Sequence, residues 1–327
     1  MLIGATIFAV VLAEIIVRGF AFDWRLINKM LYYQKADWPS HEADPNPQII
    51  FHLKPGTYDY GERAHGYKVH INAFGARGPE RSATKPPGVF RIFCFGGSNV
   101  YGSGLNDDKT WPAQLEARLN RDEPGRYEVW NFGTSAYVPM QMVALAKKKA
   151  EEFKPDLIIF AVSNGGAPAF LYGASPAPFF NRHPQLWRDL FTPPDCLVGP
   201  KEWSPEFRLA LVHWVRLYRL AAAFFAAEKG CTWVFSATHE ARNVRMAREF
   251  FEWTNGRAKV CVFLYPGTMK KDFDYGPYYR GSNVPTLTLA DPGMPPEYYD
   301  VHPPAYVMAW YADRLAEFFR QQKLLGE

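Results

Sequence analysis

The first strong pattern in the chain is an almost unbroken apolar run, MLIGATIFAVVLAEIIV, whose only polar side chains are Thr6 and Glu14. With the RGFAF that follows, it approaches the roughly 20 residues that a helix needs to cross a bilayer. The nearest basic residues, Arg18 and Arg25, follow the run, whereas a cleaved signal peptide carries basic residues before it. We therefore expect residues 1–22 to form a single membrane anchor helix. A signal peptide and an amphipathic helix packed on the protein's own core are the alternatives.

A different pattern follows the anchor. Residues 23–87 are rich in proline, glycine, histidine and charged side chains, with short alternating pieces such as YKVHIN. Alternation over so few residues is typical of short strands. We interpret residues 23–87 as a juxtamembrane connecting module with a small hairpin.

Residues 88–327 alternate between strand-like and helical patterns. The apolar runs are VFRIFCF, YEVWNF, DLIIFAV, CTWVFSA and KVCVFLY, and segments such as TWPAQLEARLN and MVALAKKKAEEF lie between them. Such alternation predicts an α/β fold, with a central parallel sheet covered by helices on both faces. A stretch dense in proline and aromatic residues, at about 168–207, reads as an insertion. It could contact a substrate, or it could be a passive cover or a protein-contact surface.

Composition removes several classes of function. At 327 residues, 48% of them hydrophobic, the chain can bury a sizeable core, and its net charge of +4 is spread out, so we expect no nucleic-acid partner. There is no GxGxxG, and HEARN at 239–243 lacks the second histidine of a zinc-protease helix, so we expect neither a cofactor nor a metal. The four cysteines, Cys94, Cys196, Cys231 and Cys261, lack CxxC spacing, and three of them lie in strand-like runs, where a free thiol behaves as a small apolar residue, so a disulfide is the less favoured reading.

Candidate chemistry lies where the predicted strands end, because ligands of open parallel sheets bind beyond the carboxyl ends of the strands. The residues that follow the first four runs are Ser98, Gly133, Asn164 and His239. A serine, a backbone amide at a glycine and an asparagine amide are what acyl transfer needs: a nucleophile and donors for an oxyanion. The C-terminal stretch YYDVHPPAYV adds a base, His302, with Asp300 before it.

Each of these residues has a plain structural alternative. Ser98 could be only a helix N-cap, Asn164 could form an Asx turn, and Gly133 could serve its backbone geometry alone. His302 could be a surface histidine at a helix entrance. His239 reads as a loop or second-layer residue, with a substitute base as the less favoured alternative.

In its motifs the chain resembles the SGNH (GDSL-like) hydrolase family, in particular its bacterial membrane-anchored members. The motifs are INAFGARGPE at 71–80, RIFCFGGSNVYGSGL at 91–105 and DDKTWPAQLEARLN at 107–120. The resemblance implies the flavodoxin-like three-layer SGNH hydrolase fold. It further implies that Ser98 is the nucleophile and an oxyanion-hole amide, that Gly133 and Asn164 complete the hole, and that His302 is the base.

The chain also departs from that family. The usual GxND block retains only Asn164, which here is flanked by Ser163 and Gly165. The supporting aspartate normally lies three positions before the histidine, but that position is Tyr299, and Asp300 lies two before His302. These changes concern the base and its partner, and they leave the nucleophile and the oxyanion donors in place.

The sequence therefore predicts a membrane-anchored serine ester hydrolase or O-acyltransferase that acts on an envelope glycan or a lipid-linked acyl ester. The alternative is a catalytically inactive SGNH-like structural or assembly subunit of a membrane complex. The expected partners are the acyl-ester substrate, the bilayer through residues 1–22 and a membrane protein. We expect the globular domain outside the cytoplasm, in the periplasm, although the positive-inside rule applied to Arg18 and Arg25 favours the opposite orientation.

Overall fold

A computed structural model describes nine segments and two single residues of the chain. They are residues 2–20, 22, 39–46, 48–61, 66–162, 200, 202–228, 237–265, 276–279, 281–289 and 302–326. The chain divides into two compact units, one made of residues 1–36 and 166–241 and the other of residues 37–165 and 242–327.

The first unit holds the N-terminal helix, α1 (Leu2–Phe20), together with α8 (Pro205–Trp214) and α9 (Arg216–Glu228). Within the described residues, α1 is the one helix long and apolar enough to cross a membrane, and its apolar window Ile3–Phe20 is almost entirely exposed. A signal sequence would meet the same criterion, as the sequence interpretation also allows.

The second unit is built on a five-stranded parallel sheet with the order β6-β5-β7-β8-β9. Its strands are β5 (Phe90–Phe95), β6 (Tyr127–Asn131), β7 (Leu157–Ala161), β8 (Lys259–Leu264) and β9 (Thr286–Thr288). In chain order the sheet reads 2-1-3-4-5, which is the flavodoxin-like arrangement. The predicted α/β class with a central parallel sheet is confirmed.

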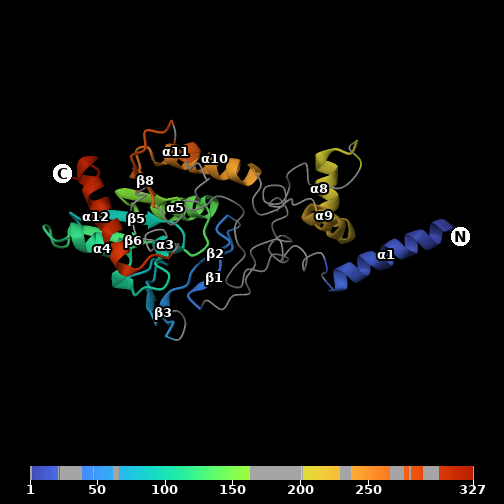
Figure 1. Ribbon diagram of the computed structural model, residues 1–327, viewed down its shortest axis with the longest axis horizontal. Coiled ribbons are helices and arrows are strands. Elements are labelled where there is room, and N and C mark those ends of the chain that lie inside the picture. Colours follow the sequence, from blue (N-terminus) through green and yellow to red (C-terminus); the bar gives the residue numbers. More distant parts are fainter. Residues whose placement is uncertain are drawn as a thin grey trace. The chain divides into compact units, whose positions relative to one another are not determined.

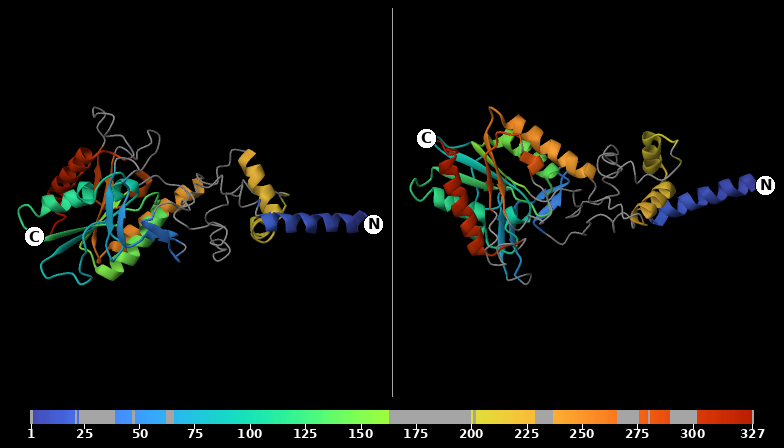
Figure 2. Two further views of the ribbon diagram at one scale, coloured as in Figure 1. Left: turned by 90° about the horizontal axis from the view of Figure 1, so that it is seen from below. Right: turned by 45° about the horizontal axis from the view of Figure 1, so that its top comes forward.

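Helices cover both faces of this sheet (Figures 1 and 2). One face carries α4 (Trp111–Leu119) and α12 (Ala305–Gln321), which pack against each other. The other carries α5 (Pro139–Phe153) and the second half of α10 (Ala237–Thr254). The helices α4 and α12 are amphipathic, whereas the strands β5 and β7 are buried on both faces.

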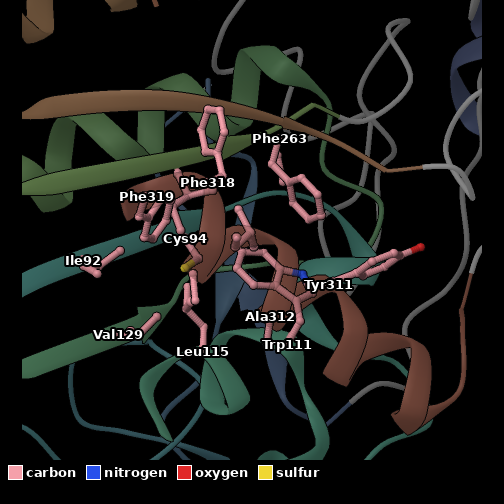
Figure 3. Packing of buried hydrophobic residues seen from close by; sticks show 14 of the residues in the cluster. Ile92, Cys94, Trp111, Leu115, Val129, Phe263, Tyr311, Ala312, Phe318 and Phe319 are labelled. Atoms are coloured by element: carbon pink, nitrogen blue, oxygen red, sulfur yellow. The ribbon is translucent and has the colours of Figure 1, made fainter. Parts of the chain in front are cut away.

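The core under α4 and α12 is continuous with the inward face of the sheet (Figure 3). Trp111 of α4 meets the Phe263 ring of β8 edge-on at 5.5 Å between centroids, and Tyr311 of α12 meets the same ring at 5.6 Å. Cys94 and Cys261 lie in this cluster as buried thiols. A tightly packed core of this kind fixes the strand ends where the candidate site lies.

Two antiparallel hairpins precede the sheet in the chain. The first pairs β1 (His41–Ala43) with β2 (Phe51–Leu53), and the second pairs β3 (Gly56–Asp59) with β4 (Lys68–Ile71). The predicted strand in YKVHIN is therefore confirmed as β4. From residue 37 onward this part of the chain belongs to the same compact unit as the sheet.

In the run CTWVFSA, residues 231–236 lie outside the described residues, so the strand predicted there stays a prediction, and Ala237 begins a helix. Among the described strands, β8 pairs directly with β7. The short strand β9 was not predicted, because its three residues TLT follow a proline and form no apolar run. The remaining described elements are the short helices α3 (Ser98–Tyr101), η1 (Asp107–Lys109) and α11 (Gly276–Tyr279).

Candidate active site

Ser98 is the first residue of α3, three positions beyond the carboxyl end of β5. Gly97 is the N-cap residue, and no side chain makes a cap hydrogen bond, so the interpretation of Ser98 as an N-cap is wrong. The serine carbonyl accepts the amides of Gly102 and Ser103, which closes the turn, while the side chain is only partly buried. Among the described residues, the Ser98 hydroxyl makes no hydrogen bond.

Gly96 allows the loop that carries Ser98 to approach the sheet closely. A Cβ atom at this position would lie 2.2 Å from Cγ2 of Val100 and 3.1 Å from the carbonyl oxygen of Ala161. Only glycine fits, because real Cβ atoms do not approach other atoms at such distances. The close contact brings the start of α3 to the end of β7, and Asn164, which follows β7, lies outside the described residues.

Gly133, just after β6, allows the end of that strand to pack closely against α3. Its Cβ would lie 2.3 Å from the amide nitrogen of Tyr101 and 2.5 Å from the carbonyl carbon of Val100. The Thr134 amide donates to the Gly96 carbonyl at 3.0 Å, which continues the pairing of the two strands past β6. The ends of β5, β6 and β7 thus converge at one edge, as the sequence predicts.

The amide of Gly133 is already engaged in this structure. It donates to Oδ1 of the buried Asn131 at 2.9 Å, and Nδ2 of Asn131 donates to the Val100 carbonyl at 2.8 Å. Asn131 therefore ties the loop after β6 to α3. The implied role of Gly133 in an oxyanion hole stays a prediction, and its backbone amide has an acceptor within the protein.

His302 is exposed and stands just before α12, whose N-cap is Pro304. The first residue of α12, Ala305, accepts a hydrogen bond from Nε2 of Gln114 at 3.3 Å, so the start of α12 lies beside the start of α4. Asp300 lies outside the described residues. The roles of His302 and Asp300 therefore stay predictions.

His239 belongs to helix α10, and the expectation that it lies in a loop after a strand of the sheet is wrong. The apolar run before it suggested a strand, but the helix has begun by Ala237. His239 belongs to the first compact unit, whereas Ser98 belongs to the second.

Arg77 is a residue of the site region that the sequence did not single out. Its guanidinium is buried and donates to the carbonyls of Tyr101 at 2.7 Å and Gly102 at 2.9 Å, and also to that of Leu105. Its Nε donates to Oδ1 of Asp107 at 2.7 Å. One side chain thus fixes the end of α3 and the loop that follows it, so Arg77 positions the helix that begins with Ser98.

The motif INAFGARG presents this arginine. Oδ1 of Asn72 accepts the amides of Phe74 and Ala76, each at 3.0 Å, which forms a tight turn. Gly75 lies inside the turn with φ +76, a conformation that favours glycine. The chain then returns so that the Arg77 amide donates to the Asn131 carbonyl of β6 at 2.8 Å. In this chain the segment INAFGARG is thus a turn that places Arg77 beside β6 and α3.

Comparisons with known proteins give similarity at the level of structure. No family model matches the chain, and no curated relative matches it. A member of the lipolytic protein G-D-S-L family from Veillonella parvula is 12% identical, covers 71% of this chain and 100% of its own, and has a TM-score of 0.37. The esterase EstA from Pseudoalteromonas sp. is 8% identical, covers 71% and 98%, and has a TM-score of 0.40.

A third solved structure, the acetylxylan esterase Axe2 from Geobacillus stearothermophilus, is 11% identical, with coverages of 73% and 95% and a TM-score of 0.35. All three likenesses are weak, at TM-scores of 0.40 and below. The function of this chain is therefore derived from Ser98 and its surroundings.

Proposed function

We propose that this protein is a serine ester hydrolase or O-acyltransferase of the SGNH type. The observation that carries the proposal is the position of Ser98: it begins a short helix at the carboxyl edge of a parallel sheet, and its hydroxyl is not spent on capping. Three strand ends and two close-packed glycines hold that helix in place. A fixed, accessible serine at this edge is suited to attack a carbonyl.

In the proposed reaction the Ser98 hydroxyl oxygen bonds to the carbonyl carbon of the acyl ester, and His302 accepts its proton. The tetrahedral intermediate collapses as the protonated imidazole returns that proton to the leaving alkoxide. An acyl-serine and a free alcohol result. Water or a sugar hydroxyl then attacks the acyl-serine, again with His302 as base, and this choice separates hydrolase from transferase. Asp300 would orient His302.

The oxyanion would be held by the Ser98 amide and the Asn164 side chain. Gly133 joins them only if its amide is shared between Asn131 and the substrate oxygen, because it already donates to Oδ1 of Asn131. Beside Ser98, both amide atoms of Asn99 are buried, and neither has a hydrogen-bond partner among the described residues. A buried amide without partners is costly.

The proposed substrate is an acyl ester on an envelope glycan or a lipid-linked carrier, and the proposed location is the membrane, with the catalytic unit outside the cytoplasm. The support is α1, whose apolar side chains are exposed along nearly its whole length. Exposed apolar surface of this extent is stable in a bilayer and costly in water. A membrane protein partner is a further expectation.

A fluorophosphonate probe tests the proposal directly, because it modifies only an activated serine. We expect the full-length protein to be labelled at Ser98, and Ser98→Ala to lose the label. Ser103→Ala is the matched control, because Ser103 lies in the same loop and its Oγ is 3.4 Å from that of Ser135. A folded wild-type protein that takes no label would overturn the proposal.

The second candidate is an inactive scaffold of a membrane complex. It is favoured by the engaged Gly133 amide, by the exposure of His302 and by the two-residue spacing from Asp300. A scaffold keeps the fold of α3 without an activated serine. The same labelling experiment separates the two candidates.

A further inference from the structure

Large apolar side chains that are exposed gather on one group of elements. Among the described residues all but one lie on α1, just after it, on α8 and α9, or just before α8. They are Ile3, Ile7, Phe8, Val10, Val11, Leu12, Ile15, Ile16, Phe20, Phe22, Trp203, Phe207, Trp214 and Phe224, with Tyr306 on α12 as the exception. The helices α8 and α9 therefore share with α1 a surface that is poorly suited to water.

The two helices are joined to α1 through Glu14. Its Oε1 accepts the amide of Arg216 at 2.9 Å, and its Oε2 accepts the amide of Leu217 at 2.7 Å. These two amides open α9 and have no acceptor within their own helix. The carboxylate thus caps α9 from another helix, and its negative charge is also favourable at a helix N-terminus.

Arg18 completes the contact one turn later on α1. Its guanidinium pairs with Glu14 at 2.7 Å, and its Nη2 donates to the carbonyl of Trp214, the last residue of α8, at 2.7 Å. Glu14 therefore accepts hydrogen bonds from the two backbone amides that begin α9, and Arg18 donates one to the backbone carbonyl that ends α8. We call this set of contacts the α1 clamp.

The α1 clamp fixes the depth of α9 if α1 spans a bilayer, the condition that comes from the proposed function. A carboxylate inside an apolar span is costly, and it is tolerated where partners satisfy it. Glu14 lies six residues before Phe20, which corresponds to about 9 Å along a helix. The first turn of α9 must lie at the same depth, just inside the edge of the hydrocarbon region. Consistent with this contact, Val17 is only 4% exposed and Ala13 and Glu14 are partly buried, whereas most of α1 is exposed.

The exposed side chains of α8 suit a position at the edge of the hydrocarbon region. Phe207 and Trp214 are seven residues apart, so they share a helix face, and they are 50% and 71% exposed. The Trp203 ring packs edge-on against Phe207 at 5.3 Å between centroids and is 39% exposed itself. Tryptophan and phenylalanine on the outer face of a short helix are typical of elements that lie in the membrane interface.

We propose that residues 203–224 form an interfacial membrane element that inserts its aromatic side chains into the bilayer beside α1. The occupant of this surface is lipid, at the boundary of headgroups and acyl chains. The α1 clamp ties α8 and α9 to the helix that the bilayer surrounds, near the edge of the hydrocarbon region, so their exposed aromatic side chains are continuous with the lipid-facing surface of α1. The protein thus contacts the membrane through two segments, a span and an interfacial helix pair.

The experiment uses the full-length protein in vesicles of phosphatidylcholine and phosphatidylglycerol, with a phosphatidylcholine that carries a diazirine on the first carbons of its acyl chain. After irradiation, mass spectrometry maps the labelled residues. We expect label on α1 and on Trp203, Phe207, Trp214 and Phe224. Tyr306, which is 53% exposed on α12, is the matched control and should stay unlabelled.

The outcomes separate this inference from the proposed anchoring. Label on α1 with none on residues 203–224 overturns the interfacial element and leaves the anchor intact. No label on α1 overturns the anchoring, and with it the depth argument. If the same probe labels residues 203–224 in purified vesicles but not in native membranes, the surface binds a protein partner and the lipid proposal is wrong.

A variant tests the α1 clamp itself. Glu14→Ala removes the cap of α9, so label on residues 203–224 should fall to the level of Tyr306 while label on α1 remains. Ile7→Ala, on the exposed part of α1 away from the clamp, should leave both signals unchanged. Circular dichroism of both variants shows whether the helices still form. Unchanged labelling in Glu14→Ala would mean that α8 and α9 reach the membrane without the clamp, which contradicts the mechanism proposed here.

Discussion

Nη1 of Arg77 donates a 2.7 Å hydrogen bond to the carbonyl of Tyr101, the last residue of the helix that begins with Ser98. The same guanidinium stacks over the Tyr101 ring, with 4.9 Å from its central carbon to the ring centroid. The hairpin region that precedes the sheet therefore reaches the candidate nucleophile through one side chain. What the sequence suggested to be a connecting module is part of the support of the site.

This contact predicts the effect of Arg77→Lys. A lysine keeps the charge but cannot reproduce the planar fork that serves the carbonyls of Tyr101, Gly102 and Leu105. Each buried carbonyl left without a donor costs about 1–3 kcal/mol, so the free energy of unfolding should fall by at least about 2 kcal/mol. Denaturant unfolding measures it. Arg314→Lys, in an exposed ion pair on α12, should change it by less than about 0.5 kcal/mol.

Ester hydrolysis by Arg77→Lys should also fall through kcat rather than KM, because α3 loses its fixed position while the substrate surface is retained. A variant with full kcat would show that Arg77 stabilises the fold without positioning Ser98.

Gly133→Ala should disrupt the site by sterics. The added Cβ would lie 2.3 Å from the Tyr101 amide nitrogen, and both segments are backbone, so α3 must move. We expect fluorophosphonate labelling of Ser98 to be lost and the unfolding midpoint to drop. Gly88→Ala is the control: its φ of +79 carries backbone strain, but no atom lies within 4 Å, so it should cost only about 1 kcal/mol and leave labelling intact.

Asn164→Ala should lower kcat by about 100-fold to 1,000-fold with little change in KM, because an oxyanion donor acts mainly in the transition state. The engagement of the Gly133 amide makes the hole more dependent on this side chain. Steady-state kinetics on an aryl acetate measures the effect. A change confined to KM would assign Asn164 to ground-state binding or to a structural turn.

His302→Ala should abolish ester hydrolysis as fully as Ser98→Ala does, since a serine hydroxyl is a poor nucleophile without a base. Asp300→Asn should leave a measurable part, because Asp300 only orients the base and its spacing differs from the family pattern. The rates of the three variants are compared at saturating substrate. Wild-type activity in His302→Ala would assign the base to another residue.

The buried His41 predicts an acid-sensitive stability. Burial, and then the nearby charge of His52, lower the pKa of His41 from its ordinary value of 6.5 to about 3. Between these pH values the unfolded chain binds a proton that the folded chain excludes, so stability falls as the pH drops. The slope is about 1.4 kcal/mol per pH unit, or about 2 kcal/mol lost by pH 5.

Urea unfolding of the full-length protein at pH 7, 6 and 5 measures this dependence. His41→Gln should flatten the part of the profile that comes from this residue, whereas His70→Gln, on the second hairpin, should retain it. Equal profiles for the wild-type protein and His41→Gln would show that other groups cause any acid sensitivity.

The sequence predicted the features that depend on long apolar runs. The strands β5, β6 and β7 and the convergence of their ends followed from runs such as FRIFCF and LIIFA, because a strand buried on both faces must be apolar throughout. The edge strand β9 did not follow, because Thr286 and Thr288 flank a single leucine and the strand needs only one neighbour. The strand predicted in the run at 231–237 falls almost entirely outside the described residues, and its last residue, Ala237, begins α10.

The contacts that hold the candidate site could not be read in the same way. The partners of Arg77 are backbone carbonyls, which every residue carries, so only the path of the chain reveals them. The acceptor of the Gly133 amide is likewise a side chain two residues away, Asn131, which had the appearance of an ordinary strand end. Side chains that bind backbone leave no pairing pattern in the sequence.

The α1 clamp also imposes an order on biosynthesis. Glu14 and the Arg216 amide are separated by 202 residues, which a ribosome needs roughly 10–40 s to add. If α1 enters the bilayer first, then during that interval the Glu14 carboxylate has Arg18 as its only partner among the residues of the α1 clamp. The span therefore reaches its final stability only after the middle of the chain has been made, so nascent chains that end before residue 216 should be more easily extracted from the membrane than complete ones.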